Sequence, residues 1–209
     1  MIVPSIIAKT FEEVKQKITQ LDGLVEWAQL DIMDGKFVIP MSWDVAEDLE
    51  TLDGKIKLEA HLMVKDPDET LVEWMNYSDR VIVHAESAAH LADSLEVFDG
   101  TPARFGVALK IDTPLSVLDD FEGKINHVQL MSIDVLGYYG AKFDEGIYDR
   151  VREVREKYPE MEISVDGGVT LENGPKLFEA GANNLIIGSA IWDSGDVVGA
   201  IKSFQALQR

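Results

Sequence analysis

The sequence alternates between short apolar runs and longer stretches of helical character, and this alternation restricts the fold more than any other feature. Apolar runs with strand-like patterns occur at residues 2–7, 27–32, 56–63, 80–85, 103–109, 127–131, 161–165 and 184–187. Helix-like stretches follow them at residues 10–21, 43–52, 67–74, 88–98, 115–121, 144–158, 171–180 and 197–207. Such alternation predicts right-handed βαβ units and a parallel sheet. Eight units of about 26 residues each would close a (β/α)8 barrel, the TIM-barrel fold. An open, doubly wound sheet is the structural alternative.

The composition predicts one globular unit with an acidic surface. Of the 209 residues, 46% are hydrophobic, which suffices for one sizeable core, so we expect a single domain over residues 1–209. The net charge of -19 disfavours nucleic acids and anionic membranes as partners, because both repel a negative surface. An anionic ligand would therefore need a local positive site.

Features of secreted and membrane proteins are missing from the sequence. There is no cysteine, and hence no disulfide or thiolate chemistry. No apolar run approaches the roughly 20 residues needed to span a bilayer. The first residues, MIVPS, lack the basic and apolar regions of a signal peptide. We therefore expect a cytoplasmic protein.

Residues that could carry out chemistry follow three of the apolar runs. Asp31 belongs to residues 30–35 (LDIMDG), His61 ends the third run, and Asp166 precedes two glycines. The carboxyl ends of the strands meet at one face of a barrel, so these side chains are expected to converge. Two carboxylates and an imidazole could hold a metal and move protons. Taken alone, His61 could be a hydrogen-bonded core histidine, and Asp-Gly-Gly is a common turn.

Gln29 lies two residues before Asp31 and shares its face of the strand. Side chains alternate along a strand, so Gln29 and Asp31 point to the same side while Leu30 and Ile32 point toward the helices. An inward polar residue in a buried strand needs a partner. Two of them favour a functional site, although a polar strand end is the alternative.

Small residues follow the seventh and eighth runs, as Gly167 and Gly168 and as Gly188 and Ser189. Barrels commonly bind phosphate with the backbone N–H groups of these two loops. Backbone donors can hold a dianion without lysines, which reconciles an anionic ligand with the acidic composition. Two tight turns would show the same residues.

The remaining features near strand ends are a loop and three methionines. Residues 137–143 (GYYGAKF) have the character of a flap with glycine hinges over the barrel mouth. Met33, Met63 and Met131 all fall near strand ends. They could be ordinary core residues or a soft apolar floor beneath a reactive carbon.

These motifs, in this order, resemble the ribulose-phosphate 3-epimerase family over nearly the full chain. The similarity is carried by residues 4–6 (PSI), 30–37 (LDIMDGKF), 61–63 (HLM), 107–109 (VAL), 113–114 (TP), 131–132 (MS), 165–169 (VDGGV) and 188–191 (GSAI). The resemblance implies a TIM barrel of the ribulose-phosphate binding type and an isomerase of pentose phosphate and carbohydrate metabolism. Such an enzyme inverts carbon 3 of a pentulose 5-phosphate, interconverting D-ribulose 5-phosphate and D-xylulose 5-phosphate.

The resemblance also implies roles for individual residues. In the family one aspartate removes a proton from one face of carbon 3, the other returns a proton to the opposite face, and a divalent metal stabilises the enediolate. Asp31 and Asp166 would be this acid/base pair and also metal ligands, with His61 as a third ligand. The residues expected to contact the sugar or its phosphate are Ser5, Met33, Met63, Met131, Gly137, Gly140, Gly167, Gly168, Gly188 and Ser189.

Three departures from the family pattern surround the expected substrate. Gln29 stands where the family has a metal-binding histidine, residues 136–141 (LGYYGA) replace Pro-Gly-Phe-Gly-Gly-Gln, and residues 38–41 (VIPM) replace Val-Pro-Asn. An amide oxygen is a harder ligand than imidazole, so we expect Mn²⁺ or Mg²⁺ to compete better with Zn²⁺, Fe²⁺ or Co²⁺ if Gln29 joins the metal shell. Alternatively, Gln29 only forms hydrogen bonds within the mouth.

These departures leave two other functions open besides a metal-assisted epimerase of a pentulose phosphate. One is an epimerase or related enzyme acting on another phosphosugar, such as a hexulose 6-phosphate. The other is a phosphosugar-binding barrel without catalysis. A homo-oligomer is compatible with the sequence.

Overall fold

The strands form a closed parallel barrel in which each strand pairs with its neighbours in the chain and β8 closes on β1. The computed structural model describes residues 1–87, 104–121 and 124–208. The strands are β1 (Ile2–Ile6), β2 (Trp27–Met33), β3 (Lys57–Met63), β4 (Arg80–His84), β5 (Arg104–Leu109), β6 (His127–Met131), β7 (Glu162–Asp166) and β8 (Asn184–Ile187). The predicted TIM barrel is therefore confirmed, and the open sheet is not found.

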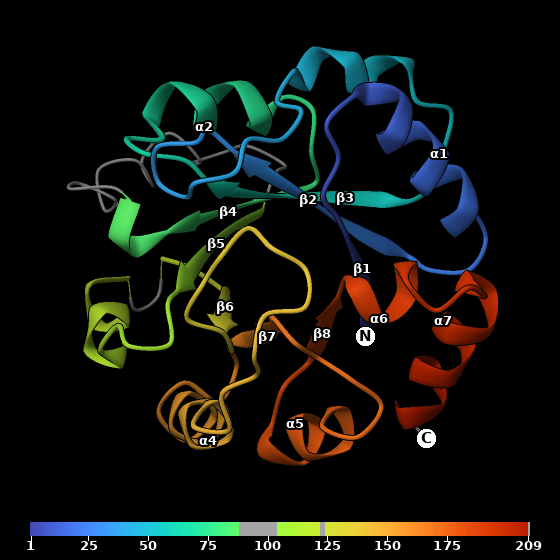
Figure 1. Ribbon diagram of the computed structural model, residues 1–209. Helices are drawn as coiled ribbons and strands as arrows, with labels where there is room; N and C mark the ends of the chain where they lie inside the picture. Colours follow the sequence, from blue (N-terminus) through green and yellow to red (C-terminus); the bar gives the residue numbers. More distant parts are fainter. Residues whose placement is uncertain (88–103, 122–123, 209) are drawn as a thin grey trace.

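Helices surround the barrel (Figure 1). They are α1 (Phe11–Leu21), α2 (Asp68–Met75), α4 (Ile147–Lys157), α5 (Gly174–Ala180), α6 (Ser189–Trp192) and α7 (Val197–Gln205). Thr10 caps α1, because its side chain accepts a hydrogen bond from the Glu13 N–H. The helix expected over residues 88–98 lies outside the described residues. Within the described part of the chain, no helix has the length and apolar character to cross a membrane.

Two expected helices are instead 3₁₀ segments, η1 (Ala46–Thr51) and η4 (Leu115–Phe121). In η4 the buried residues Leu115, Leu118 and Phe121 recur every third position, which matches the three-residue turn of a 3₁₀ helix. The segment over residues 43–52 begins later than expected. The Trp43 N–H is bonded to the Ala8 carbonyl, which holds the chain outside a helix at that point.

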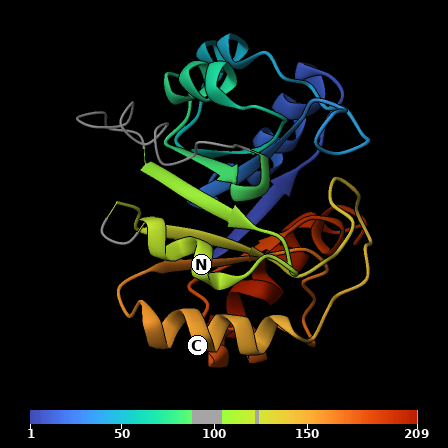
Figure 2. The same cartoon turned by 90° about the vertical axis from the view of Figure 1, so that its left-hand side faces the viewer.

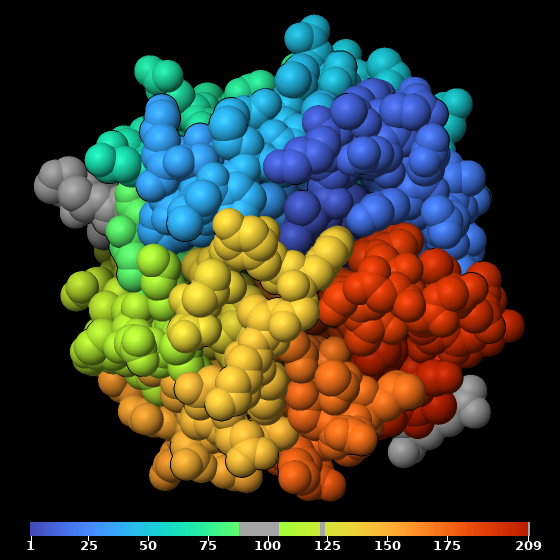
Figure 3. All heavy atoms as spheres, viewed as in Figure 1, coloured from blue at the N-terminus to red at the C-terminus, as the bar shows by residue number. Residues whose placement is uncertain are grey.

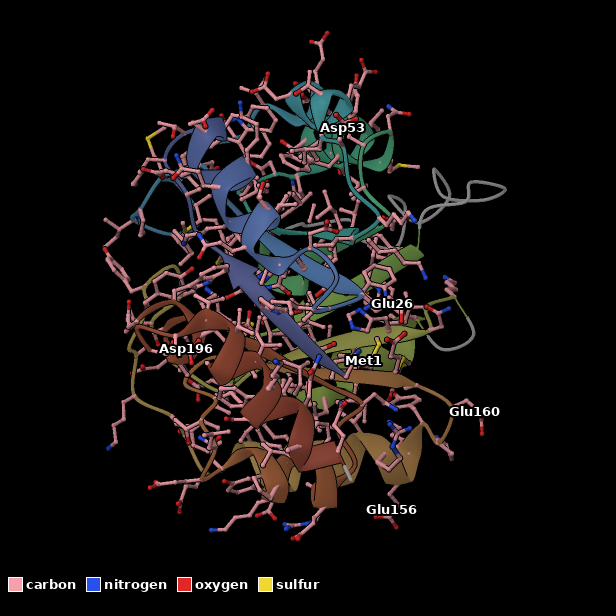
Figure 4. All side chains as sticks on the ribbon, turned by 90° about the vertical axis from the view of Figure 1, so that its right-hand side faces the viewer. Met1, Glu26, Asp53, Glu156, Glu160 and Asp196 are labelled. Carbon is pink, nitrogen blue, oxygen red and sulfur yellow. The ribbon has the colours of Figure 1, made fainter. Side chains whose placement is uncertain are left out.

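The core lies mainly between the barrel wall and the surrounding helices. Leu30 and Ile32 of β2 belong to this outer apolar layer, whereas Gln29, Asp31 and Met33 face the barrel interior. Acidic residues such as Glu156 and Asp196 lie on the outside (Figure 4). Figure 4 also shows that Met1, Glu26 and Glu160 lie toward the end of the barrel where the strands begin. The barrel interior thus contains polar side chains of β2, whereas the layer between strands and helices is apolar and acidic residues lie on the outer surface.

The strand register brings the predicted motifs to one end of the barrel. Asp31 pairs with His61, and Met131 pairs with Asp166. The loop between β6 and α4 crosses this end of the barrel (Figures 1 and 2). The carboxyl ends of the strands thus form a mouth that contains the candidate functional residues.

Candidate active site

Five buried or partly buried side chains converge inside the barrel mouth, and we call them the mouth cluster: Asp31, His61, Asp166, Gln29 and Gln129. The Nδ1 atom of His61 lies 3.2 Å from Asp31 Oδ1 and 3.6 Å from Asp166 Oδ2. Asp31 and Asp166 come from β2 and β7, which are separated by β1 and β8 around the barrel. The structure therefore brings together the two aspartates and the histidine that the sequence singled out.

The electrostatics of the cluster favour a positive charge between the two carboxylates. Burial raises the pKa of the Asp166 carboxyl, and the Asp31 carboxylate raises it further. Burial disfavours the His61 imidazolium, but the hydrogen bond with Asp31 and the nearby carboxylates outweigh it and raise the pKa of His61. Burial of Asp166 and the two nearby carboxylates around His61 therefore favour a proton or a cation at this position.

A chain of hydrogen bonds fixes which nitrogen of His61 faces the carboxylates. Burial lowers the pKa of His84 to about 4, so its ring is neutral near pH 7. Its Nδ1–H donates to Glu86 Oε2 at 3.1 Å, because a carboxylate can only accept. Its Nε2 must then accept from the Nε2–H of His61 at 2.9 Å. Glu86 and His84 therefore hold His61 with Nδ1 turned toward Asp31 and Asp166.

The Asp31, His61 and Asp166 group fits a divalent cation. Their ligand atoms all lie within 4.8 Å of one another, and carboxylate oxygen with imidazole nitrogen suits several divalent ions. The tautomer set by His84 supplies a lone pair at Nδ1 on the correct side when His61 is neutral. Among the described residues, neither aspartate forms an ion pair with a lysine or arginine.

The mouth cluster opens into an inner cavity of about 50 Å³ that contains most of the predicted substrate residues. Its lining includes Asp31, His61, Asp166, Ser5, Met63, Met131, Gly137, Gly140, Gly167, Gly168, Gly188 and Ser189. Met33 is not part of this lining, and its Sδ atom lies next to Gly137 of the loop. An outer cavity of about 810 Å³ shares Gly140, Gly168 and Ser189 with the inner one.

The loop predicted as a flap covers the mouth through Tyr139. The Tyr139 hydroxyl accepts from the Ile7 N–H and donates to the Ser5 carbonyl. Gly137 and Gly140 on either side have positive φ angles of 84° and 76°, which favour glycine. Atoms of this loop lie over the centre of the mouth in the space-filling view (Figure 3). The small inner volume follows from this closed arrangement.

The β7 and β8 loops bring backbone close to the same cavity. Gly167 and Gly168 both have positive φ, so the chain turns there without a side chain in the way. A Cβ atom at Gly188 would lie 2.4 Å from Tyr139 Cε1 and 3.0 Å from Ser5 Oγ. These loops therefore place bare backbone between the inner and outer cavities, at the expected phosphate position.

Sequence reasoning missed Gln129 and the positioning role of His84 and Glu86. Gln129 lies two residues before Met131 on β6, so its inward direction could have been found by the same alternation that singled out Gln29. The bond from His84 to His61 depends on the pairing of β3 with β4 and on the side-chain directions. A single sequence gives no signal for that contact.

Comparison with known proteins agrees with the geometry. The model of the ribulose-phosphate 3 epimerase family matches residues 1–192. The chain is 32% identical to the chloroplastic ribulose-5-phosphate-3-epimerase of Arabidopsis thaliana, covering 100% of this chain and 77% of the relative. It is 30% identical to the ribulose-phosphate 3-epimerase of Bacillus subtilis, covering 98% and 97%.

Solved structures with low sequence identity show the same fold. A 3-hexulose-6-phosphate synthase matches with a TM-score of 0.70 at 17% identity, covering 99% of this chain and 98% of that one. An orotidine 5'-phosphate decarboxylase from Pyrococcus horikoshii matches with a TM-score of 0.70 at 14% identity over the whole of both chains. The family match and the curated relatives define an enzyme of the isomerase class, an epimerase. The chain belongs to the ribulose-phosphate 3-epimerase family.

Proposed function

We propose that the protein is a metal-assisted epimerase that inverts carbon 3 of a ketose phosphate and interconverts D-ribulose 5-phosphate and D-xylulose 5-phosphate. The observation that carries this proposal is the entry of Asp31 and Asp166 into one small cavity from two separated strands. Inversion requires a proton to leave one face of a carbon and another to arrive at the opposite face. Two carboxylates that enter one cavity from separated strands could serve the two faces of a carbon, whereas binding alone needs no such pair.

The chain's own residues divide the work in this proposal. One aspartate removes the proton from carbon 3, and the other protonates the opposite face. Asp31, His61 and Asp166 would hold a divalent cation, with Gln29 beside them, and His84 keeps His61 in the required tautomer. The ion, when bound, stabilises negative charge on the sugar oxygens as a Lewis acid. Tyr139 and its loop exclude water from the cavity.

The phosphate group of the substrate is proposed to bind the backbone of Gly167, Gly168, Gly188 and Ser189. Ser5, Met63 and Met131 would contact the sugar, and Gly137 and Gly140 would allow the loop to open and close. Met33, whose Sδ atom lies next to Gly137, would support the loop from below. The backbone N–H groups of these loops would attract the phosphate, which the acidic surface of the protein would otherwise repel.

A second candidate is an epimerase for a larger phosphosugar, such as a hexulose 6-phosphate. The outer cavity of about 810 Å³ beside the phosphate loops favours it, because there is room beyond the inner cavity. A phosphosugar-binding protein without catalysis is the third candidate, and the substitution at Gln29 favours that one.

Incubation with each sugar phosphate in deuterium oxide separates the three candidates. We expect ribulose 5-phosphate to give xylulose 5-phosphate with deuterium at carbon 3. Proton NMR follows the exchange. The second candidate would exchange deuterium into the hexulose 6-phosphate and form its epimer, but would not act on ribulose 5-phosphate. The binding protein gives no exchange with either sugar, a result that would overturn the proposal. Asp34→Asn is the matched control for Asp31→Asn, because both aspartates belong to residues 30–35. Asp34 accepts hydrogen bonds from the backbone N–H groups of Lys36, Phe37 and Lys65.

A further inference from the structure

Two fully buried glutamines enter the mouth cluster from different walls of the barrel. Gln29 comes from β2 and Gln129 from β6, and neither side chain is exposed. The Nε2 atom of Gln29 lies 2.9 Å from Asp31 Oδ1 and 3.2 Å from Asp166 Oδ2. The Nε2 atom of Gln129 lies 2.9 Å from Asp166 Oδ2 and 3.2 Å from His61 Nδ1. Both amide ends therefore lie against the atoms that would bind a cation.

The carbonyl oxygen of each amide has no hydrogen-bond partner. Gln29 Oε1 and Gln129 Oε1 are both buried, and neither finds a donor among the residues that the structure describes. A buried polar atom without a hydrogen-bond partner destabilises the folded protein. A half turn of the amide would exchange the oxygen for the nitrogen at nearly constant shape. Without a cation, that turn would place the oxygen against carboxylates. With a cation between them, the same turn gives the oxygen a partner.

The separations in the cluster also match those between neighbouring ligands of one ion. With metal–oxygen distances of about 2.1 Å, adjacent ligand atoms of an octahedron lie about 3.0 Å apart. The end of Gln29 lies 2.9–3.4 Å from one atom each of Asp31, Asp166 and His61. The end of Gln129 lies 2.9–3.2 Å from Asp166 and His61. Both amide ends thus lie where further ligands of the same ion would be.

We propose that Gln129 is a ligand of the divalent cation and acts with Gln29, each presenting its amide oxygen once the ion is bound. The proposal deepens the proposed function and rests on the cation site assigned there. The complete set would be two carboxylates, one imidazole and two amide oxygens, which is rich in hard oxygen ligands. Such a set favours Mn²⁺ and Mg²⁺ over Zn²⁺ relative to a site with more imidazole ligands.

Titration of the substrate-free protein with Mn²⁺ tests the role of Gln129, with free Mn²⁺ followed by electron paramagnetic resonance. Gln129→Leu replaces the amide side chain with an apolar one of similar bulk. We expect it to raise the Kd for Mn²⁺ by about 10–100-fold. Ser164→Ala is the matched control, since Ser164 pairs with Gln129 in the barrel but bonds His127 and Asn184 instead of the cluster. Its Kd for Mn²⁺ should equal that of the wild type.

The melting temperature of the cation-free protein distinguishes a ligand from a structural residue. Gln129→Leu removes a buried carbonyl without a partner but also the Nε2 donor to Asp166 Oδ2, so we expect the two effects to offset and the melting temperature to change little. A purely structural role predicts a fall in melting temperature with no change in the Mn²⁺ Kd. Gln129→Met, which also lacks an amide, repeats the titration if the leucine variant does not fold.

An unchanged Mn²⁺ Kd in the folded Gln129 variant would overturn the inference. It would leave the proposed function intact, because deuterium exchange by the wild type is measured separately. A wild-type protein that binds no Mn²⁺ would also overturn the inference. If that protein still epimerised the sugar in the presence of a chelator, the aspartate assignment would stand without the cation.

Discussion

Two clusters of buried polar groups occupy the same barrel interior, and they differ in how their charge is balanced. The mouth cluster lies at the carboxyl ends of the strands. The second, which we call the floor cluster, lies nearer their amino ends and consists of Glu59, Arg80, Glu162, Ser164 and Asn184. Arg80 donates to Glu59 and to Glu162 at 3.0 Å and also lies over the Trp27 ring.

Because of this difference, the floor cluster maintains the fold and the mouth cluster has capacity for a ligand. In the floor cluster a fixed guanidinium neutralises much of the carboxylate charge, although burial still raises the pKa of Glu59 to about 7. In the mouth cluster, Asp31 and Asp166 have only His61 as an ion-pair partner in the described part of the chain. The compensating charge must come from a proton or from something bound.

The largest expected effect is on catalysis in the mouth cluster. Asp31→Asn and Asp166→Asn should each lower turnover by at least about 10²–10⁴-fold, because each removes the base for one face of carbon 3. Neither should lower the melting temperature of the cation-free protein, since each relieves repulsion between carboxylates. Steady-state kinetics and thermal melting check both statements. Near wild-type turnover by either variant on the true substrate would refute the two-base mechanism.

The floor cluster should respond in the opposite way. Arg80→Met leaves Glu59 buried without its cation and should lower the free energy of unfolding by about 3–5 kcal/mol. The double variant Arg80→Met with Glu59→Met should recover most of that loss. Urea denaturation gives both values. If the double variant were as unstable as the single one, charge pairing would not be what stabilises this cluster.

Lowering the pH should reduce the free energy of unfolding through His84, which contacts the mouth cluster. Its pKa is lowered by burial to about 4, below the unfolded value near 6.5, so the unfolded chain takes up the proton first as the pH falls. This histidine therefore contributes stability above pH 6.5 that is lost between pH 6.5 and 4, up to about 3 kcal/mol. His84→Gln keeps an acceptor for His61 and should lose less stability over that window. Denaturation at pH 7 and at pH 4.5 gives the comparison, and equal losses would contradict it.

A bulky residue at Gly188 should weaken binding of the phosphate group. Gly188→Val should raise KM by about 10–100-fold by blocking one or more backbone donors to a charged group. Because a Cβ there meets Tyr139 first, the measurement is repeated in a Tyr139→Ala background. The KM effect should persist in that background. Equal turnover of dephosphorylated sugars by the wild type would show that the loops do not bind phosphate.

The smallest expected effect concerns the identity of the cation. Gln29→His places a second imidazole next to Asp31 and should raise Zn²⁺ affinity relative to Mn²⁺. Competition titrations with the two ions measure the ratio. An unchanged ratio together with unchanged activity would remove Gln29 from the cation site and leave it as a hydrogen-bonding residue of the mouth.

The sequence predicts the barrel well because its signals are local. Apolar runs, turns and alternation place Asp31, His61 and Asp166 at strand ends, and the closed barrel then brings them together. The two 3₁₀ segments differ from the expected helices, because their buried residues recur every third position and fit the three-residue turn of a 3₁₀ helix.

The parts of the site that sequence reasoning missed depend on side-chain contacts between neighbouring strands. Gln129 reaches Asp166 from the neighbouring strand, and His84 reaches His61 in the same way. The orientation of each side chain and the absence of a partner for each amide oxygen among the described residues exist only in three dimensions. Residue spacing cannot supply them.

Isotope exchange by the two aspartate variants tests the two-base mechanism most directly. Asp31→Asn and Asp166→Asn are each incubated with ribulose 5-phosphate and, separately, with xylulose 5-phosphate in deuterium oxide. If each aspartate serves one face, each variant should place deuterium at carbon 3 of only one epimer, and the two variants should choose opposite epimers. Exchange into the same epimer by both variants, or conversion between epimers by either, would contradict the account.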